Sequence, residues 1–310
     1  MPIWITIVII AQFLNAIVSI IDKHIVTDEK VSHPIVYVFY VGVLSTLSLY
    51  IFSLGFIPVS FFGVELPHIE EVILPTFDLF FRSLLAGYAF VAGLFYLYTA
   101  LKRSDASDII PVVGSTSSIT TFLISFIFLG EILTDNFILG FTFLIMSMVI
   151  LSHFRFSKKI LMYAIISGAL YAIYYSSMKV MFNDFVFEQA FYWSRIGILI
   201  ATSTILLIPR YRRIIFHGVK QTKIKNTAWV LGNNILGGLA GIALLIATQM
   251  GSVSIVQAMS GLQFAFIVIF SVLFGRMTPA SFGENNNIND IIQKVVSILF
   301  IVFGFYLLFR

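Results

Sequence analysis

One arginine lies inside a long apolar stretch of the sequence, where an unpaired charge is costly. Arg195 stands about ten residues into the apolar run 186–208, and Tyr192 and Glu188 precede it on the same face of a helix. A charge at the centre of a membrane costs about 2.5–3.5 kcal/mol on insertion scales. Two interpretations stay open: the guanidinium binds an anionic group of a substrate, or it forms a structural ion pair or snorkels.

Amide and hydroxyl side chains recur on single faces of several other apolar runs. Such groups inside a membrane normally face a bundle interior or a cavity, because lipid offers them no hydrogen-bond partner. Interhelical hydrogen bonds are the alternative, especially for Asn15, Asn234 and Gln263. Together with the arginine, the predicted substrate-binding residues are Gln12, Asn15, Ser115, Tyr171, Arg195, Asn234, Gln257 and Gln263.

The carboxylates are expected at or near helix ends, as for Asp22, Asp78, Asp108, Glu131 and Glu188. A proton-driven cation exchanger would need a buried carboxylate that titrates. The sequence therefore favours a uniporter or exchanger of neutral or anionic metabolites. A proton-coupled multidrug or organic-cation exporter is the alternative. Glu131 is expected to cap a helix end or to pair with a loop base, with a coupling role as its alternative.

The remaining chemistry-bearing residue types argue against an enzyme. The chain has no Cys, which excludes disulfides, thiolate metal sites and cysteine catalysis. The five His are scattered, and no paired carboxylates lie at mid-depth, so no catalytic cluster is visible. No cofactor and no metal are expected. An integral-membrane lipid-modifying enzyme is kept as a further alternative.

The composition of the chain indicates which solvent its helices meet. Of its 310 residues 59% are hydrophobic and 11% are charged, whereas soluble domains average about 45–50% and about 25%. The mean hydropathy is +0.99. Continuously apolar runs of about 20 residues predict membrane-spanning helices and not strands. Ten such runs are predicted: 3–22, 34–56, 79–101, 107–129, 136–154, 160–182, 186–208, 228–249, 252–275 and 290–309. The first is expected to be retained as a span.

Basic residues gather in every second connection between these runs. All of the 19 Lys and Arg lie in or near the odd-numbered connections except Arg82, Lys179, Arg195 and Arg310. The positive-inside rule then places the odd connections in the cytoplasm and both termini on the non-cytoplasmic side. We expect a multi-pass protein of the cell (inner or plasma) membrane. The basic connector 210–226 is expected to rest on anionic lipid headgroups.

The two halves of the sequence are weakly similar. The stretch LNAIVSIIDK at 14–23 is echoed by LYAIYYSSMK at 170–179, and further short matches keep the same order. The chain therefore divides into five-helix halves, 1–155 and 156–310. Because five is odd, the second half would enter the membrane inverted. Inverted repeats are typical of secondary transporters, whose substrate site lies near the midplane between them.

A set of short motifs occurs in the segment 96–151: Leu97, Ala100-Leu101, Ala106-Ser107, Gly130-Glu131, Leu133-Thr134 and Gly140. In these residues the segment resembles the EamA-type family of the drug/metabolite transporter superfamily. The lysine that closes the first and sixth runs and the arginine of FYWSRIG at 191–197 are also similar to that family. The resemblance implies ten helices and export or exchange of metabolites such as amino acids, nucleotide sugars or organic cations.

These observations predict an all-α integral membrane protein with ten transmembrane helices, arranged as two inverted five-helix repeats. The predicted function is an alternating-access secondary transporter of small polar metabolites such as amino acids, or of other neutral or anionic organic solutes. The expected partners are a small-molecule substrate and membrane lipids. Nucleic acid is not expected, and a homodimer stays open.

Overall fold

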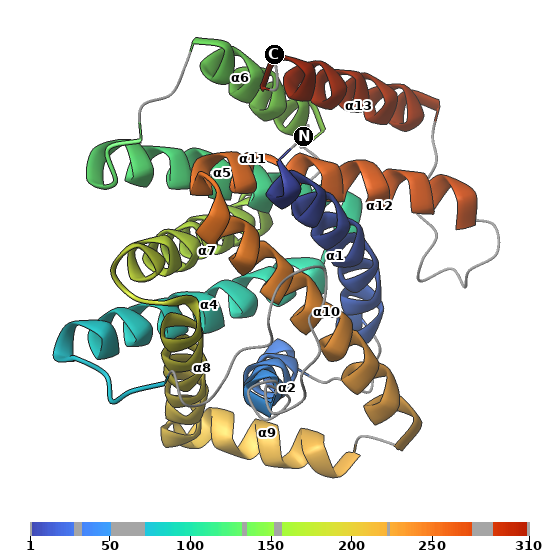
Figure 1. The fold of residues 1–310 in the computed structure, drawn as a ribbon. Helices are drawn as coiled ribbons and strands as arrows, with labels where there is room; N and C mark the ends of the chain where they lie inside the picture. Colours follow the sequence, from blue (N-terminus) through green and yellow to red (C-terminus); the bar gives the residue numbers. More distant parts are fainter. Residues whose placement is uncertain are drawn as a thin grey trace.

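The structure, a computed structural model, describes residues 2–27, 33–50, 72–131, 135–151, 157–221, 224–274 and 288–308. Every regular element in these ranges is a helix (Figure 1). This agrees with the continuously apolar runs, because a helix pairs its backbone groups internally where lipid cannot. The prediction of an all-α protein is therefore confirmed for this part of the chain.

The helices follow the predicted runs approximately, with bounds that differ by several residues in places. A separate helix, α9, occupies the basic connector, and the ninth predicted run is divided near Met259 into α11 and α12. In chain order the helices are α1 (Ile3–Thr27), α2 (Pro34–Ser45), α4 (Phe77–Leu101), α5 (Ala106–Phe128), α6 (Asp135–Leu151), α7 (Lys158–Asp184), α8 (Phe187–Thr204), α9 (Pro209–Gln221), α10 (Ile224–Met250), α11 (Val253–Ala258), α12 (Ser260–Phe274) and α13 (Ile288–Leu308). The short 3₁₀ segments η1 (Thr46–Tyr50) and η3 (Ile205–Leu207) extend α2 and α8.

Side-chain caps explain where several of these helices begin. The hydroxyls of Thr76, Ser157 and Ser252 accept hydrogen bonds from backbone N–H groups in the first turns of α4, α7 and α11. Each cap satisfies one of the N–H groups that a helix start leaves without a partner.

Length and composition mark the fold as that of a membrane protein. Seven helical segments of the described residues are long and apolar enough to cross a membrane, and Pro34–Tyr50 and Ile138–Ser147 form shorter apolar helices. Large apolar side chains such as Ile10, Leu85 and Phe126 point outward with more than half of their surface exposed. A lipid environment accounts for such an exterior, which water would not tolerate. The seven segments are Ile3–Thr27, Phe77–Leu101, Ala106–Phe128, Lys158–Asp184, Phe187–Leu207, Trp229–Met250 and Val253–Phe270.

The central helices form two groups that face each other. In the first group α1 packs against α10 and α12, and in the second α7 packs against α4 and α5. α8 covers α4, while α6 and α13 pack on each other and lie apart from α2, α8 and α9 (Figure 1). The Ser147 hydroxyl of α6 donates to the Ser297 carbonyl of α13 at 2.8 Å. These two helices therefore lie at the periphery of the bundle.

Close approach of α7 and α5 depends on a glycine. A Cβ at Gly168 would come within 2.5 Å of the Val113 carbonyl oxygen and within 2.7 Å of the Thr116 Cβ. Small residues at such crossings let helix backbones pack closely inside a membrane.

Two lysines join the first helix group to the second. The Lys23 ammonium of α1 donates to the Leu101 carbonyl at the end of α4, at 2.8 Å. The Lys179 ammonium of α7 donates to the Thr248 and Gly251 carbonyls at the end of α10, at 3.0 and 2.8 Å. The last carbonyls of a helix lack backbone partners and carry the negative end of its dipole, so each lysine satisfies them.

Candidate functional site

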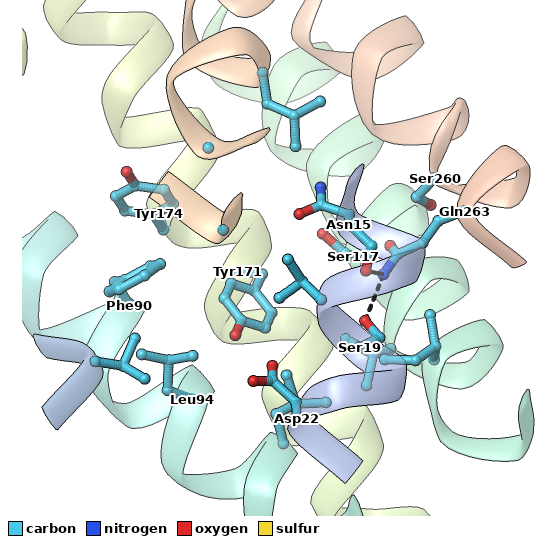
Figure 2. Close-up of a pocket in the computed structure, with 18 of the residues that line it drawn as sticks. Asn15, Ser19, Asp22, Phe90, Leu94, Ser117, Tyr171, Tyr174, Ser260 and Gln263 are labelled. Atoms are coloured by element: carbon cyan, nitrogen blue, oxygen red, sulfur yellow. Dashed lines mark hydrogen bonds between the residues drawn. The ribbon is translucent and has the colours of Figure 1, made fainter. Parts of the chain in front are cut away.

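A cavity of about 220 Å³ lies between the two helix groups, and polar and aromatic side chains surround it (Figure 2). Its lining comes from α1, α2, α4, α5, α7, α8, α10, α11 and α12. Seven of the eight predicted site residues lie on this lining: Gln12, Asn15, Tyr171, Arg195, Asn234, Gln257 and Gln263. Their role in binding a substrate stays a prediction.

Ser115 is the predicted residue that does not line the cavity. Its buried hydroxyl donates to the Pro111 carbonyl of its own helix, at 2.5 Å. Ser117 takes its place and donates to the Gln257 side-chain oxygen at 3.2 Å. Two residues along a helix correspond to about 200° of rotation, so the two serines face opposite sides.

The amides differ in how much of their hydrogen-bonding capacity the protein uses. The Gln263 amide of α12 donates to the Ser19 hydroxyl of α1 at 2.8 Å (Figure 2) and to the Asn15 carbonyl at 3.2 Å. The Asn234 amide donates within α10, to the Val230 carbonyl at 2.9 Å. An interhelical hydrogen bond is therefore present at Gln263, and the bond that the structure gives for the Asn234 side chain lies within its own helix.

Arg195 is buried, with 7% of its surface exposed. One guanidinium nitrogen donates to the Tyr174 hydroxyl of α7 at 3.2 Å, and the Phe191 ring lies 4.6 Å from the guanidinium carbon. Within the described residues no carboxylate pairs with it. Glu188 and Tyr192, predicted on the same face, are not among the residues that line the cavity. A structural ion pair is thus absent from the described surroundings of Arg195.

Asp22, predicted to lie at or near a helix end, proves to line the cavity. α1 continues to Thr27, so Asp22 lies inside the helix, where it is 6% exposed and lines the cavity. Its carboxylate accepts hydrogen bonds from the Tyr37 hydroxyl at 2.5 Å and from the Asn233 amide at 2.7 Å. The apolar residues Ile25 and Val26 that follow it were the sequence signal for a longer helix.

Aromatic rings form one wall of the cavity, and most of them were not predicted as site residues. The Phe90 ring centroid lies 5.0 Å from that of Tyr174 and 6.2 Å from that of Tyr171. Figure 2 shows the Tyr171 hydroxyl pointing toward Asp22 and not toward Asn15. Tyr37 and Tyr98 pack against each other near the same carboxylate, with tilted rings whose centroids are 4.6 Å apart.

Several polar atoms of the lining residues lack a partner within the described chain. They are buried, and an unpaired buried polar atom costs about 1–3 kcal/mol, so such atoms mark places where a polar ligand would be stabilised. These atoms are the Gln12 side-chain oxygen, the Arg195 Nε, the Asn233 side-chain oxygen and the Ser260 hydroxyl.

Glu131 is not among the residues that line the cavity, and it lies at the beginning of α11, which Ser252 caps. Its carboxylate accepts from the hydroxyls of Ser252 and Ser254 at 2.9 and 2.7 Å, at the beginning of α11. A negative charge at a helix N-terminus is favoured by the helix dipole.

Comparison with known proteins defines the fold and gives no activity. No family model and no curated protein match the chain in sequence. In structure it is similar to a solved protein described as "Crystal structure of protein", with a TM-score of 0.63 and 12% identity over 97% of this chain and 94% of that one. The likeness therefore shows a shared fold over nearly the full length of both chains. The fold and the cavity define an α-helical membrane protein with a polar internal site.

Proposed function

We propose that this chain is an alternating-access carrier of small polar metabolites, similar to the EamA-type drug/metabolite transporters. One observation carries the proposal: seven residues singled out from five separate apolar runs line a single cavity between two helix groups. A scaffold or a lipid-modifying enzyme gives no reason for amides, an arginine and aromatic rings to converge there. The cavity volume of about 220 Å³ suits a small metabolite.

The proposed architecture is ten membrane helices in two inverted five-helix repeats, 1–155 and 156–310. Helix contacts that occur in corresponding pairs support it. The packing of α1 against α10 corresponds to that of α7 against α4, and α1 against α12 corresponds to α7 against α5. The contacts of Lys23 and Lys179 form a further pair of this kind. Such pairs are expected from a two-fold axis in the membrane plane.

The proposed transport cycle uses the boundary between the two helix groups. The substrate binds in the cavity, where side-chain amides, hydroxyls and aromatic rings replace its hydration shell. Rocking of α1, α10 and α12 against α4, α5 and α7 then opens the cavity to one face or the other. Lys23 and Lys179 would stabilise the closed boundary at opposite ends, because α1 and α7 enter the membrane from opposite faces in this arrangement.

The cell membrane is the proposed location, with both termini on the non-cytoplasmic side. Arg210, Arg212 and Arg213 are exposed on α9, which follows directly after α8. A basic helix at a membrane surface attracts anionic headgroups, and this supports placing α9 at the cytoplasmic face.

A second candidate is the export of organic cations, and Asp22 is the observation that favours it. A buried carboxylate inside the cavity can bind a cationic substrate or a proton in turn. The expectation that no acid lies in the site had weighed against this function, and the position of Asp22 removes that objection.

Counterflow in proteoliposomes tests the carrier proposal. Proteoliposomes that contain the purified protein are loaded with excess unlabelled solute from a panel of amino acids, nucleotides and organic cations. They should accumulate the labelled solute, at a rate that saturates with its concentration. Gln263→Leu should reduce this counterflow, because it removes a polar group of the cavity. Thr142→Ala is the matched control, since that exposed hydroxyl donates only within α6, to the Ile138 carbonyl at 2.8 Å. Linear, unsaturable flux would indicate a channel, and a new product without net movement would indicate an enzyme.

A further inference from the structure

Two buried charges of opposite sign line the cavity, and neither has a charged partner among the described residues. Asp22 and Arg195 come from α1 and α8 and are 6% and 7% exposed. Isolated charges in a low-dielectric interior are strongly destabilising unless a counter-charge compensates them. The chemistry of the cavity is therefore dipolar, with one acidic and one basic position.

At the acidic position every described contact to the carboxylate comes from a neutral donor. The Tyr37 hydroxyl and the Asn233 amide bind the same carboxylate oxygen, at 2.5 and 2.7 Å. The neighbouring Lys23 does not compensate it, because its ammonium is held by the Leu101 carbonyl at 2.8 Å and lies 3.7 Å from Asp105. The hydroxyl–carboxylate distance is typical of a charge-assisted hydrogen bond. Tyr98 also hydrogen-bonds to this carboxylate, so all of these partners are neutral and the charge of Asp22 is left for a cationic group.

At the basic position the guanidinium is held in place but its donors are incompletely used. Tyr174 accepts from one terminal nitrogen and Phe191 covers the guanidinium carbon, so its orientation is fixed. The structure gives no acceptor for the other terminal nitrogen of Arg195 in the described residues. A guanidinium with free, oriented donors binds carboxylates in a bidentate contact.

The path between the two charges is lined by aromatic rings. Tyr171 has its hydroxyl toward Asp22, and Tyr174 and Phe90 continue the wall from it (Figure 2). Tyr174 in turn contacts Arg195. A ligand that touches both charges would lie along this wall, with its apolar part against the rings.

We propose that the cavity selects a zwitterion, with its cationic nitrogen at Asp22 and its anionic group at Arg195. The inference rests on the proposed function and narrows its substrate class from small polar metabolites to molecules that carry both charges. A zwitterion compensates both buried charges in one binding event. A molecule with a single charge compensates either Asp22 or Arg195 and leaves the other residue uncompensated. A neutral molecule leaves both residues uncompensated.

Matched triads of compounds test this selection by the thermal stability of the purified full-length protein, because a ligand of the folded state raises its melting temperature. The zwitterions are the proteinogenic α-amino acids and the ω-amino acids from β-alanine to 6-aminohexanoate. Each is compared with the amine that lacks its carboxylate and with the acid that lacks its amine, as 4-aminobutanoate with butylamine and butanoate. We expect at least one zwitterion to bind about tenfold or more tightly than both partners. Equal binding of a single-charge partner, or no binding by any zwitterion, overturns the inference.

Two variants assign each charge to its residue. Asp22→Asn should remove the advantage of the zwitterion over the acid, while it keeps the advantage over the amine. Arg195→Gln should do the reverse, and Arg195→Lys should retain part of the preference for a carboxylate. Asp184→Asn, which removes an exposed partner of Arg82 outside the cavity, controls for general loss of folding. Loss of both preferences in both variants would contradict the two-position site.

The result separates this inference from the carrier proposal. Saturable counterflow of a cation or a neutral solute, without preference for zwitterions, would overturn the inference and leave the carrier standing. Zwitterion binding without counterflow would support the dipolar site and contradict the carrier.

Discussion

Lys23 and Lys179 make corresponding contacts at the ends of two different helices. Each ammonium donates to terminal carbonyls, Lys23 at the end of α4 and Lys179 at the end of α10. Lys23 thereby joins α1 of the first helix group to α4 of the second, and Lys179 joins α7 of the second group to α10 of the first. The pair thus fixes the boundary across which the cavity would have to open.

Loss of either lysine should shift the cavity toward one face of the membrane. The chain has no Cys, so Gly238→Cys can report access to the cavity, which Gly238 lines at a place where a Cβ meets nothing within 4 Å. We expect Lys23→Gln to raise labelling from the cytoplasmic face and Lys179→Gln to raise it from the opposite face, each by about tenfold if about 1.4 kcal/mol of contact is lost. Lys158→Gln, exposed at the start of α7, is the control. Shifts toward the same face would contradict opposite roles.

The beginnings of α1 and α7 should lie on opposite sides of the membrane. Ile3 and Lys158 are exposed in the first turns of these helices. With Ile3→Cys and Lys158→Cys as single thiols, an impermeant maleimide applied to intact cells should label only the first, and permeabilisation should expose the second. Labelling of both from one face would exclude the inverted arrangement.

Removing the Asn233 amide should destabilise the protein, whereas the same change at its neighbour should not. Asn233→Leu takes a 2.7 Å donor from buried Asp22 and a 3.1 Å donor from Tyr37, so we expect a loss of about 1–3 kcal/mol in unfolding free energy. Asn234→Leu breaks a hydrogen bond within α10 and should change the unfolding free energy by less than about 0.5 kcal/mol. Unfolding in mixed micelles measures both, and equal losses would show that the Asp22 contact is not the cause.

Two glycine-to-alanine changes should affect the unfolding free energy differently. Gly168→Ala places a Cβ within 2.5 Å of the Val113 carbonyl of α5, and overpacking of this kind costs about 1–3 kcal/mol. Gly232→Ala, also helical, meets nothing within 4 Å and should be neutral, or stabilising by up to about 1 kcal/mol through helix propensity. Thermal unfolding of the two variants in the same detergent checks the prediction, which a stable Gly168→Ala protein would refute.

His33 should make the stability of the protein depend on pH. Its Nδ1 accepts from the Ile35 N–H at the start of α2, at 3.2 Å, which requires the neutral ring. Burial, then Lys102 and Arg210, lower the pKa of His33 below its ordinary value. A lowered folded pKa gives stability that is present above the unfolded value of about 6.5 and is lost as the pH falls below it toward the folded value.

Melting temperatures at about pH 7.5 and about pH 5.5, on either side of the ordinary imidazole pKa, measure this dependence. We expect a lower melting temperature at the acidic pH for the natural chain. His33→Asn should show a smaller decrease, because Asn caps a helix without titrating. An unchanged pH dependence in His33→Asn would exclude this histidine as the source.

Which residues surround the cavity could be predicted only in part. The helical faces of Gln12, Arg195 and Gln263 followed from local spacing, and these residues do line the cavity. Ser115 was predicted to bind substrate but does not line the cavity, because Ser117 is the serine of α5 that faces inward. Asp22 was missed because its polar neighbours concealed the last turn of α1.

The amino-acid sequence was enough to predict an all-α membrane protein and the approximate positions of most of its helices. These properties depend on the length and hydropathy of each run, which are local quantities. The three-dimensional arrangement was needed to show which face of each helix points inward, that Arg195 contacts Tyr174, and that Asn233 reaches Asp22 across 211 positions. Helix rotation and pairing are set by packing between distant segments, and a single run of sequence carries no record of its neighbours.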